Sequence, residues 1–412
     1  MIGIANGVGG GRRRRHWNGR LQRTGWLCLF AGVSLVQADE NVYLTGVPDY
    51  SWHAGCYGTC TGNLIGYWDR HGFPDFYTGP TAGGVAPLNS SGSNSGIYNL
   101  WASKAGRDGR PANQPGHEDD YYVDYESTAD DPYVTAHRPE HAPDCVGDFI
   151  GLNQKKWTNL GGECDGNIDG FTYTYWNRKG FRQNNFTPSA NSGLPATDSQ
   201  SGLRAWARHC GYHADTFTQL AEFNPEVATP GEGFTYDEVK AEIDAGYPLI
   251  AHLQVKNEYY RSIGDMPRAN PEIHATLIYG YYVTAGKQYV RIRTSWGTGD
   301  NVLCEWRDVS WLGLPNMPVR GVVGFHPRPE ITASERNGNQ LTLHWVGPDA
   351  EVYDQTTSTR RQAHWYVVER ASVLNDADFA AVSNPTTARE WTGDDCCPGS
   401  VFYRIKLVPT PQ

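Results

Sequence analysis

The sequence predicts two folded regions, the first combining helices with antiparallel strands and the second, at the C-terminus, built from strands alone. The first region has an apolar helical run that begins at Cys56 and a strand-turn-strand pattern that begins at His274. After residue 328 the pattern changes to short strands in which apolar and polar residues alternate. Because 412 residues exceed the size of an ordinary single domain, we place the two regions at 39–326 and 327–412.

The N-terminus has the composition of a secretory signal peptide. Six arginines precede the apolar stretch Trp26–Val36, which is followed by the small residue Ala38. A stretch of this length is too short to span a bilayer, and basic residues in front of it are typical of export signals. We therefore expect residues 1–38 to be removed and the protein to be secreted, either extracellular or periplasmic.

The chain that remains after this removal is strongly acidic. Loss of six arginines and of no acidic residue changes the net charge from −10 to about −16. An acidic chain without a basic stripe binds nucleic acid poorly. No further apolar stretch is long enough to cross a membrane. We therefore expect neither nucleic acid nor, after signal cleavage, a membrane as a partner.

The run from Cys56 to Asp69 has the spacing of a buried helix. One face carries residues at helical intervals that favour burial: Cys56, Cys60, Leu64, Tyr67 and Trp68. A second face carries glycines four residues apart: Gly58, Gly62 and Gly66. Because each glycine costs about 1 kcal/mol in a helix relative to alanine, their repetition predicts close contact with another backbone. A thiol at a helix N-terminus favours the nucleophilic thiolate, which makes Cys56 a candidate nucleophile.

This run resembles the nucleophile helix of papain-like cysteine peptidases, most closely that of secreted relatives of the bacteriocin-processing (double-glycine leader) peptidases. The residues in register with that pattern are Gly55, Cys56, Thr59, Gly62, Gly66, Tyr67, Trp68 and Asp69. The resemblance implies an α+β papain-like fold for residues 39–326, with the nucleophile helix buried on an antiparallel sheet. It also implies that a Cys–His thiolate mechanism hydrolyses peptide bonds in a peptide or protein substrate, with no cofactor and no metal ion.

A helix, a buried strand and a hairpin follow later in the first region, and the hairpin contains the expected general base. Thr235 and Glu238 have the spacing of a capping box at a helix start, and Tyr247–Leu253 is typical of a buried strand. His274 begins an aromatic, β-branched run, and the hairpin that follows would bring Thr294 back beside it. The family has its residues in the order cysteine, histidine, then asparagine or aspartate, so the resemblance implies that His274 is the base.

The third expected member of the site departs from the family pattern. Thr294 stands where the resemblance places asparagine or aspartate, in the segment Thr294-Ser295-Trp296-Gly297. A threonine hydroxyl can accept a hydrogen bond from imidazole, but it is short and neutral; Asp300 is the next choice if its loop folds back. A catalytically degenerate domain, acting as a secreted binding or adhesion protein, is therefore the alternative function. A transglutaminase-like or amidase reaction would use the same Cys–His chemistry.

Other residues near the nucleophile have open roles. Cys60 is a rival nucleophile, although it shares the core-facing stripe and buried cysteines often act as small apolar residues. Tyr50 stands where the family has the glutamine of its oxyanion hole, so that side-chain donor is unassigned.

Of the nine cysteines, Cys28 lies in the expected signal peptide. The disulfide connectivity of the rest, including the adjacent pair Cys396-Cys397, is open.

The segment Asp165–Gly170 matches the first half of a calcium loop, with oxygen-bearing side chains at positions 1, 3 and 5 and glycine at position 6. Trp176 stands where such a loop has its bidentate glutamate. A turn rich in Asp, Asn and Gly is therefore the commoner explanation of this segment, and a calcium site stays an open alternative.

The C-terminal region has the pattern of a small β-sandwich. Its expected strands are Leu341–Trp345, Trp365–Arg370 and Tyr403–Leu407, and Pro327 and Pro329 form an expected linker before them. An early strand tryptophan and a late Tyr-x-Ile strand resemble a fibronectin type III-like sandwich. We therefore expect the chain to have an α+β papain-like domain followed by an all-β sandwich.

Overall fold

The computed structural model describes residues 39–77, 85–102, 145–152, 164–165, 172–188, 198–254, 272–297, 299, 302–307, 309–311, 314–394 and 401–410. The expected signal peptide (1–38), residues 166–170 of the calcium-loop segment, Asp300 and the pair Cys396-Cys397 lie outside the described residues. Within the described residues, no helix has the length and apolar character needed to cross a membrane.

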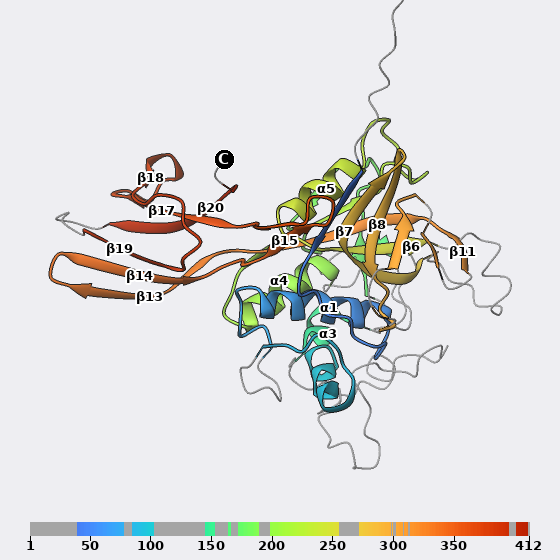
Figure 1. The fold of residues 1–412 in the computed structure, drawn as a ribbon, viewed down its shortest axis with the longest axis horizontal. Helices are drawn as coiled ribbons and strands as arrows, with labels where there is room; N and C mark the ends of the chain where they lie inside the picture. Colours follow the sequence, from blue (N-terminus) through green and yellow to red (C-terminus); the bar gives the residue numbers. More distant parts are fainter. Residues whose placement is uncertain are drawn as a thin grey trace, which may run out of the picture. The chain divides into compact units, whose positions relative to one another are not determined.

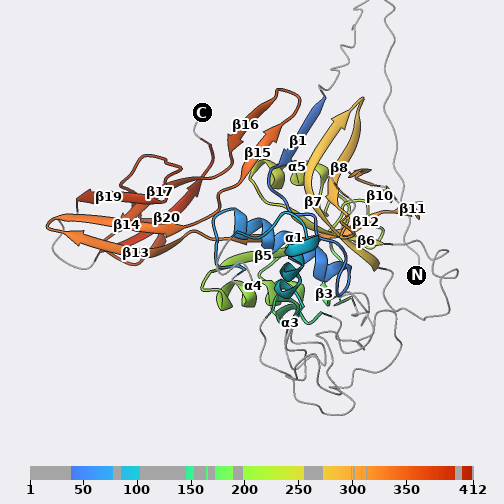
Figure 2. The ribbon, with the colours of Figure 1, turned by 60° about the horizontal axis from the view of Figure 1, so that its bottom comes forward.

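A ten-stranded antiparallel sheet organises the first region (Figures 1 and 2). Eight strands follow the order β16-β15-β1-β7-β6-β12-β5-β4, while β8 pairs with β7 and β9 pairs with β8. The strands are β1 (Glu40–Leu44), β4 (Gln183–Asn184), β5 (Ala214–Leu220), β6 (Leu249–Gln254), β7 (Glu272–Thr284), β8 (Lys287–Arg293), β9 (Val302–Glu305), β12 (Val319–Pro327), β15 (Glu351–Asp354) and β16 (Thr359–Gln362). This arrangement confirms the expected mixture of helices with antiparallel strands.

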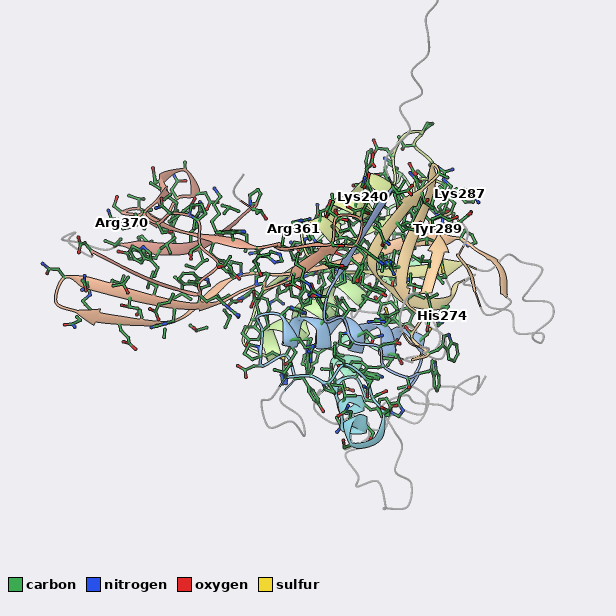
Figure 3. The ribbon with its side chains drawn as sticks, in the orientation of Figure 1. Lys240, His274, Lys287, Tyr289, Arg361 and Arg370 are labelled. Carbon is green, nitrogen blue, oxygen red and sulfur yellow. The ribbon has the colours of Figure 1, made fainter. Side chains whose placement is uncertain are left out.

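The predicted hairpin is formed by β7 and β8, which are joined through Ala285 and Gly286. Both residues have positive φ (48° and 76°), the conformation that a two-residue hairpin turn requires. Figure 3 shows Lys287 near this turn and His274 toward the opposite end of the hairpin. Because Leu277 pairs with Arg293, the residues that follow β8 lie beside the first residues of β7. The sequence pattern therefore placed His274 correctly relative to the end of β8.

Helix α1 (Cys56–Arg70) begins at the predicted residue, and all of its residues except the last are buried. It packs against β6 and β7. The sequence predicted that its glycines contact another backbone. They instead accommodate side chains, most of them aromatic. A Cβ on Gly62 would lie 2.3 Å from the Trp101 ring, and one on Gly66 would lie 2.5 Å from the Tyr50 hydroxyl. The glycine stripe therefore makes room for the rings of Trp101 and Tyr50, which stack on each other with centroids 5.5 Å apart.

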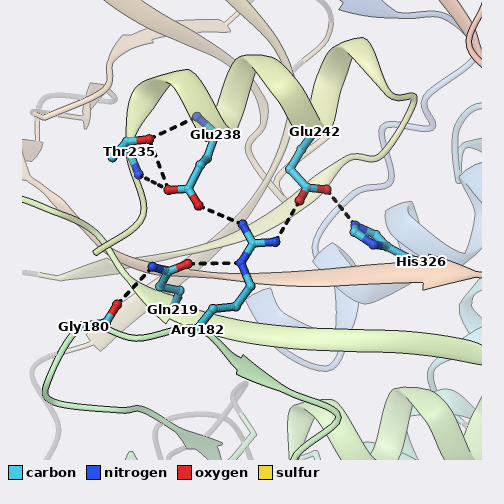
Figure 4. Close-up of polar contacts among 7 residues, drawn as sticks. All are labelled: Gly180, Arg182, Gln219, Thr235, Glu238, Glu242 and His326. Atoms are coloured by element: carbon cyan, nitrogen blue, oxygen red, sulfur yellow. Dashed lines mark hydrogen bonds and ion pairs between the residues drawn. The ribbon is translucent and has the colours of Figure 1, made fainter. Parts of the chain in front are cut away.

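The other described helical elements are η1 (Gly92–Leu100), α3 (Val146–Ile150), α4 (Ser199–His209), α5 (Tyr236–Asp244) and η3 (Asp376–Asp378). The predicted capping box of α5 is confirmed, since Glu238 N donates to Thr235 Oγ1 and Thr235 N donates to Glu238 Oε2. Figure 4 shows how Arg182 then ties this helix to β5. Its guanidinium reaches Glu238 and Glu242 at 3.1 and 3.4 Å, and its Nε donates to Gln219 Oε1 at 3.2 Å.

Two three-stranded antiparallel sheets, β13-β14-β19 and β18-β17-β20, form most of the C-terminal region. Their strands are β13 (Glu330–Asn337), β14 (Gln340–Val346), β17 (Trp365–Ala371), β18 (Ala380–Ala381), β19 (Glu390–Asp394) and β20 (Phe402–Val408). Leu343 and Trp345 from one sheet share a buried core with Val368 and Ile405 from the other. The expected all-β character of this region is thus confirmed. Two short sheets, β2–β3 (Cys164–Asp165, Thr174–Tyr175) and β10–β11 (Val309–Trp311, Leu314–Met317), complete the described strands.

The expected boundary at 326/327 does not separate the two cores. The hairpin β15–β16 lies between β14 and β17 in the sequence, yet β15 pairs with β1, with Val352 opposite Leu44. Val352 is 1% exposed and, with Ala350, belongs to the buried core of the first region. Residues 37–412 accordingly form one compact unit. Proline and turn signals predicted a linker, but they carry no information about where a distant hairpin pairs.

Candidate active site

Cys56 is the first residue of α1 and is 6% exposed. The turn before it has left-handed backbone at Ala54 (φ 53°) and Gly55 (φ 100°). Thr59 stabilises this turn, since its hydroxyl donates to Gly55 O at 2.9 Å and accepts from His53 N at 3.0 Å. As the first helical residue, Cys56 has a backbone N–H outside the i→i−4 hydrogen-bond ladder of the helix. Its sulfur and its N–H therefore belong to the electropositive end of the helix.

His274 lies in β7 and is 5% exposed. Its Nε2 is 2.6 Å from the main-chain oxygen of Thr294. A carbonyl oxygen can only accept, so Nε2 carries a proton and the lone pair of the neutral ring is on Nδ1. Burial lowers the pKa of His274 to about 4, although the bond to Thr294 opposes this shift. The imidazole is therefore neutral near pH 7.

Thr294 contacts His274 as predicted, but through a different group. The Thr294 hydroxyl accepts a hydrogen bond from Trp296 N at 3.2 Å, whereas the main-chain carbonyl accepts from the imidazole. The contact that the structure shows between the two residues is thus made by the main chain of Thr294. Because every residue type has a backbone carbonyl, the departure from asparagine or aspartate does not remove the orienting acceptor.

Ser295 joins the elements that carry the candidate residues, and the sequence analysis did not single it out. Its hydroxyl donates to Ala275 O at 2.9 Å, next to His274, and its side chain is also hydrogen-bonded to Cys60 on α1. Its φ of 63° is uncommon for a residue with a side chain. Its only sequence signal was its position between Thr294 and the exposed Trp296.

Cys60 is a structural residue in this arrangement rather than a second nucleophile. Its side chain is completely buried, and burial raises the pKa of its thiol well above the ordinary value. The neighbouring Cys56 raises that pKa further, while the hydrogen bond between Cys60 and Ser295 opposes the shift. A thiol held in its neutral form is a poor nucleophile. Of the two cysteines, Cys56 is therefore the better candidate.

The first turn of α1 lies against the strand ends that carry His274. Tyr57 makes an edge contact with His252 of β6, with ring centroids 5.2 Å apart. His252 pairs in turn with Ala275 of β7, one residue after His274. Together with the link from Cys60 through Ser295, these contacts bring the start of α1 and the start of β7 into one neighbourhood.

Two tryptophans form the outer wall of this neighbourhood. Trp296 stacks on the His274 ring with centroids 5.5 Å apart and planes at 14°, and it also stacks on Trp52 at 6.2 Å. Trp296 is 42% exposed, whereas His274 is buried beneath the surface. The indole therefore shields the hydrogen bond between the imidazole and Thr294 from water.

Tyr50 does not supply an oxyanion donor. Its hydroxyl donates to Pro87 O at 2.7 Å and lies against Gly66. Gly66 is ten residues along α1 from Cys56, which corresponds to about 15 Å. The Tyr50 hydroxyl therefore lies too far along the helix to donate to an oxyanion at Cys56.

The described residues contain no group of three or more side chains suited to hold a metal ion. The question of a calcium site stays open, because most of its expected loop lies outside the described residues.

Comparison with protein-family models, with curated protein sequences and with solved structures finds no match to this chain.

Proposed function

We propose that this chain is a secreted cysteine peptidase of papain-like architecture, with Cys56 as nucleophile and His274 as general base. The observation that carries the proposal is the hydrogen bond between His274 Nε2 and Thr294 O, at the strand end against which α1 begins. This bond supports one ring orientation and leaves the basic lone pair on Nδ1. A buried, oriented imidazole on a strand that packs against a helix with a cysteine at its N-terminus has the parts that acyl transfer requires.

The reaction would proceed through a thioester. Nδ1 of His274 takes the thiol proton of Cys56, and the sulfur attacks the carbonyl carbon of the peptide bond. The oxygen that becomes negative accepts a hydrogen bond from the Cys56 N–H. The protonated imidazole then gives its proton to the leaving amine as the C–N bond breaks. Water, deprotonated by the same nitrogen, hydrolyses the thioester and releases the acid together with free enzyme.

A second candidate function is that of a secreted binding protein with a degenerate peptidase domain. The burial of both residues favours it, since Cys56 and His274 are 6% and 5% exposed and Trp296 covers the imidazole. Under either function, we propose that the two three-stranded sheets of the C-terminal region form a fibronectin type III-like module. Their strand order and shared core support that assignment.

Thiol reactivity separates the two functions. We expect iodoacetamide at pH 6–7 to modify Cys56 at least about 10-fold faster than the buried Cys60, as measured by peptide mass spectrometry. Cys56→Ser should abolish hydrolysis of fluorescein-labelled casein, while the matched variant Cys60→Ala should retain it. Preferential labelling of Cys60, or turnover that survives Cys56→Ser, would refute the assignment. A Cys56 that resists labelling in a chain without turnover would favour the binding protein.

A further inference from the structure

A groove of about 700 Å³ begins beside the candidate active site. At one end it is lined by Ser51 and Gly297, the neighbours in sequence of Trp52 and Trp296. These two residues are packed tightly, since a Cβ on Gly297 would lie 2.6 Å from Ser51 Oγ. The groove therefore shares its wall segments with the tryptophans that cover His274.

A residue from the C-terminal hairpin also lines the groove. Arg360 of β16 lines the groove together with Tyr43 and Thr45 of the first region. Its NH1 is 2.5 Å from Glu351 Oε1, an oxygen that also accepts from Thr45 Oγ1 at 3.1 Å. Its guanidinium carbon lies 5.1 Å from the centroid of the Tyr353 ring. Contacts with Glu351 and Tyr353 of β15 thus hold this guanidinium at the groove, and Thr45 of the first region in turn holds Glu351.

Arg360 has hydrogen-bonding capacity left for a ligand. Its side chain is 61% exposed, and among the described residues its other N–H groups meet no acceptor. A guanidinium can hold a carboxylate through two parallel hydrogen bonds, a geometry that lysine does not offer. The volume of the groove is also within the range of pockets that bind ligands.

We propose that this groove binds the segment of a polypeptide substrate next to the scissile bond, and that Arg360 binds a carboxylate of that segment. The proposal rests on the proposed function, because the described residues that line the groove include neither Cys56 nor His274. The groove is linked to His274 through the segments that carry Trp52 and Trp296. It assigns the C-terminal hairpin a part in substrate selection. The carboxylate belongs either to an acidic side chain or to a free C-terminus, which share the same chemistry.

The next residue provides a matched control. Successive side chains of a strand face opposite sides of the sheet. Arg361 accordingly points away from the groove, where its NH2 is 2.8 Å from Asp244 Oδ1, and it lines a separate cavity of about 520 Å³ (Figure 3 labels it). Neutralising Arg361 therefore changes the net charge of the protein by the same amount without altering the groove.

The test uses the chain 39–412 with Cys56→Ala, immobilised and exposed to a fully randomised octapeptide pool with free or amidated C-termini. Mass spectrometry of the retained peptides should show about 10-fold enrichment of carboxylates. Enrichment of Asp and Glu in both pools identifies a side chain, and enrichment only in the free-acid pool identifies the terminus. Addition of Arg360→Gln should abolish the enrichment, and Arg361→Gln should preserve it. Thermal unfolding confirms that each variant is folded.

Three results would overturn this assignment: no retained peptides, retained peptides without carboxylate enrichment, or enrichment that survives Arg360→Gln. Because Cys56→Ala cannot cleave, the outcome does not depend on turnover. A protein that binds acidic peptides through Arg360 but hydrolyses none of them would contradict the proposed peptidase alone. A Cys56-dependent peptidase without Arg360-dependent binding would contradict the groove assignment alone.

Discussion

A chain that ends at residue 326 should lose the fold of the first region, although the sequence pattern predicts a module boundary there. Truncation removes β15 and β16, and β1 then becomes an unprotected edge of the large sheet. Exposed edge strands pair readily with other chains, so aggregation should accompany the loss of stability. The perturbation therefore tests whether the C-terminal hairpin is a structural part of the first region.

The size of the effect follows from the contacts that disappear. Burial of a valine side chain such as Val352 contributes about 1.5–3 kcal/mol. Backbone hydrogen bonds across the cut also vanish, each worth about 0.5–1.5 kcal/mol, among them those from Thr45 N to Glu351 O, from Gln355 N to Asn41 O and from Asp349 N to His71 O. The loss reaches about 5 kcal/mol, which is comparable with the whole stability of many domains, about 5–15 kcal/mol.

Urea unfolding monitored by near-UV circular dichroism would measure this loss in chains 39–326 and 39–412. Val352→Ala in the full chain should lower the free energy of unfolding of the first region by about 2 kcal/mol. Leu343→Ala, in the core between the two three-stranded sheets, is the matched control and should leave that transition unchanged. If 39–326 unfolds at the same urea concentration as the full chain, with the same near-UV spectrum, the reasoning is refuted.

Two further predictions concern single polar side chains. Thr294→Ala should keep the alkylation rate of Cys56 within about threefold, because the carbonyl that accepts from His274 remains; a loss approaching the roughly 10⁴-fold cost of a misoriented triad histidine would show that the hydroxyl orients the ring. Burial raises the pKa of Asp69 to about 7 although its oxygens accept from Tyr77 N and Ala86 N. The folded state then binds this proton more tightly than the unfolded chain, so stability should fall as pH rises from about 4 through 7. Asp69→Asn should flatten that slope in urea titrations, and an unchanged slope would assign it to other groups.

Local patterns were sufficient to predict the elements that carry the candidate site. Helix α1 begins at Cys56 because apolar residues recur at helical intervals from that position, and its burial follows from the same spacing. The hairpin that presents His274 follows from alternation and a two-residue turn at Ala285-Gly286. In each case the interactions that decide the structure join residues close together in the sequence.

Long-range packing decided the rest. The hairpin β15–β16 joins β1 across roughly three hundred residues, and no local signal distinguishes a strand that completes its own sandwich from one that completes another sheet. The orienting acceptor for His274 is a backbone carbonyl, which every residue has and which side-chain patterns therefore cannot reveal. The sequence by itself determined which residues form the nucleophile helix and the histidine hairpin. Only the tertiary structure decided which atoms meet, because those contacts depend on the register between distant strands.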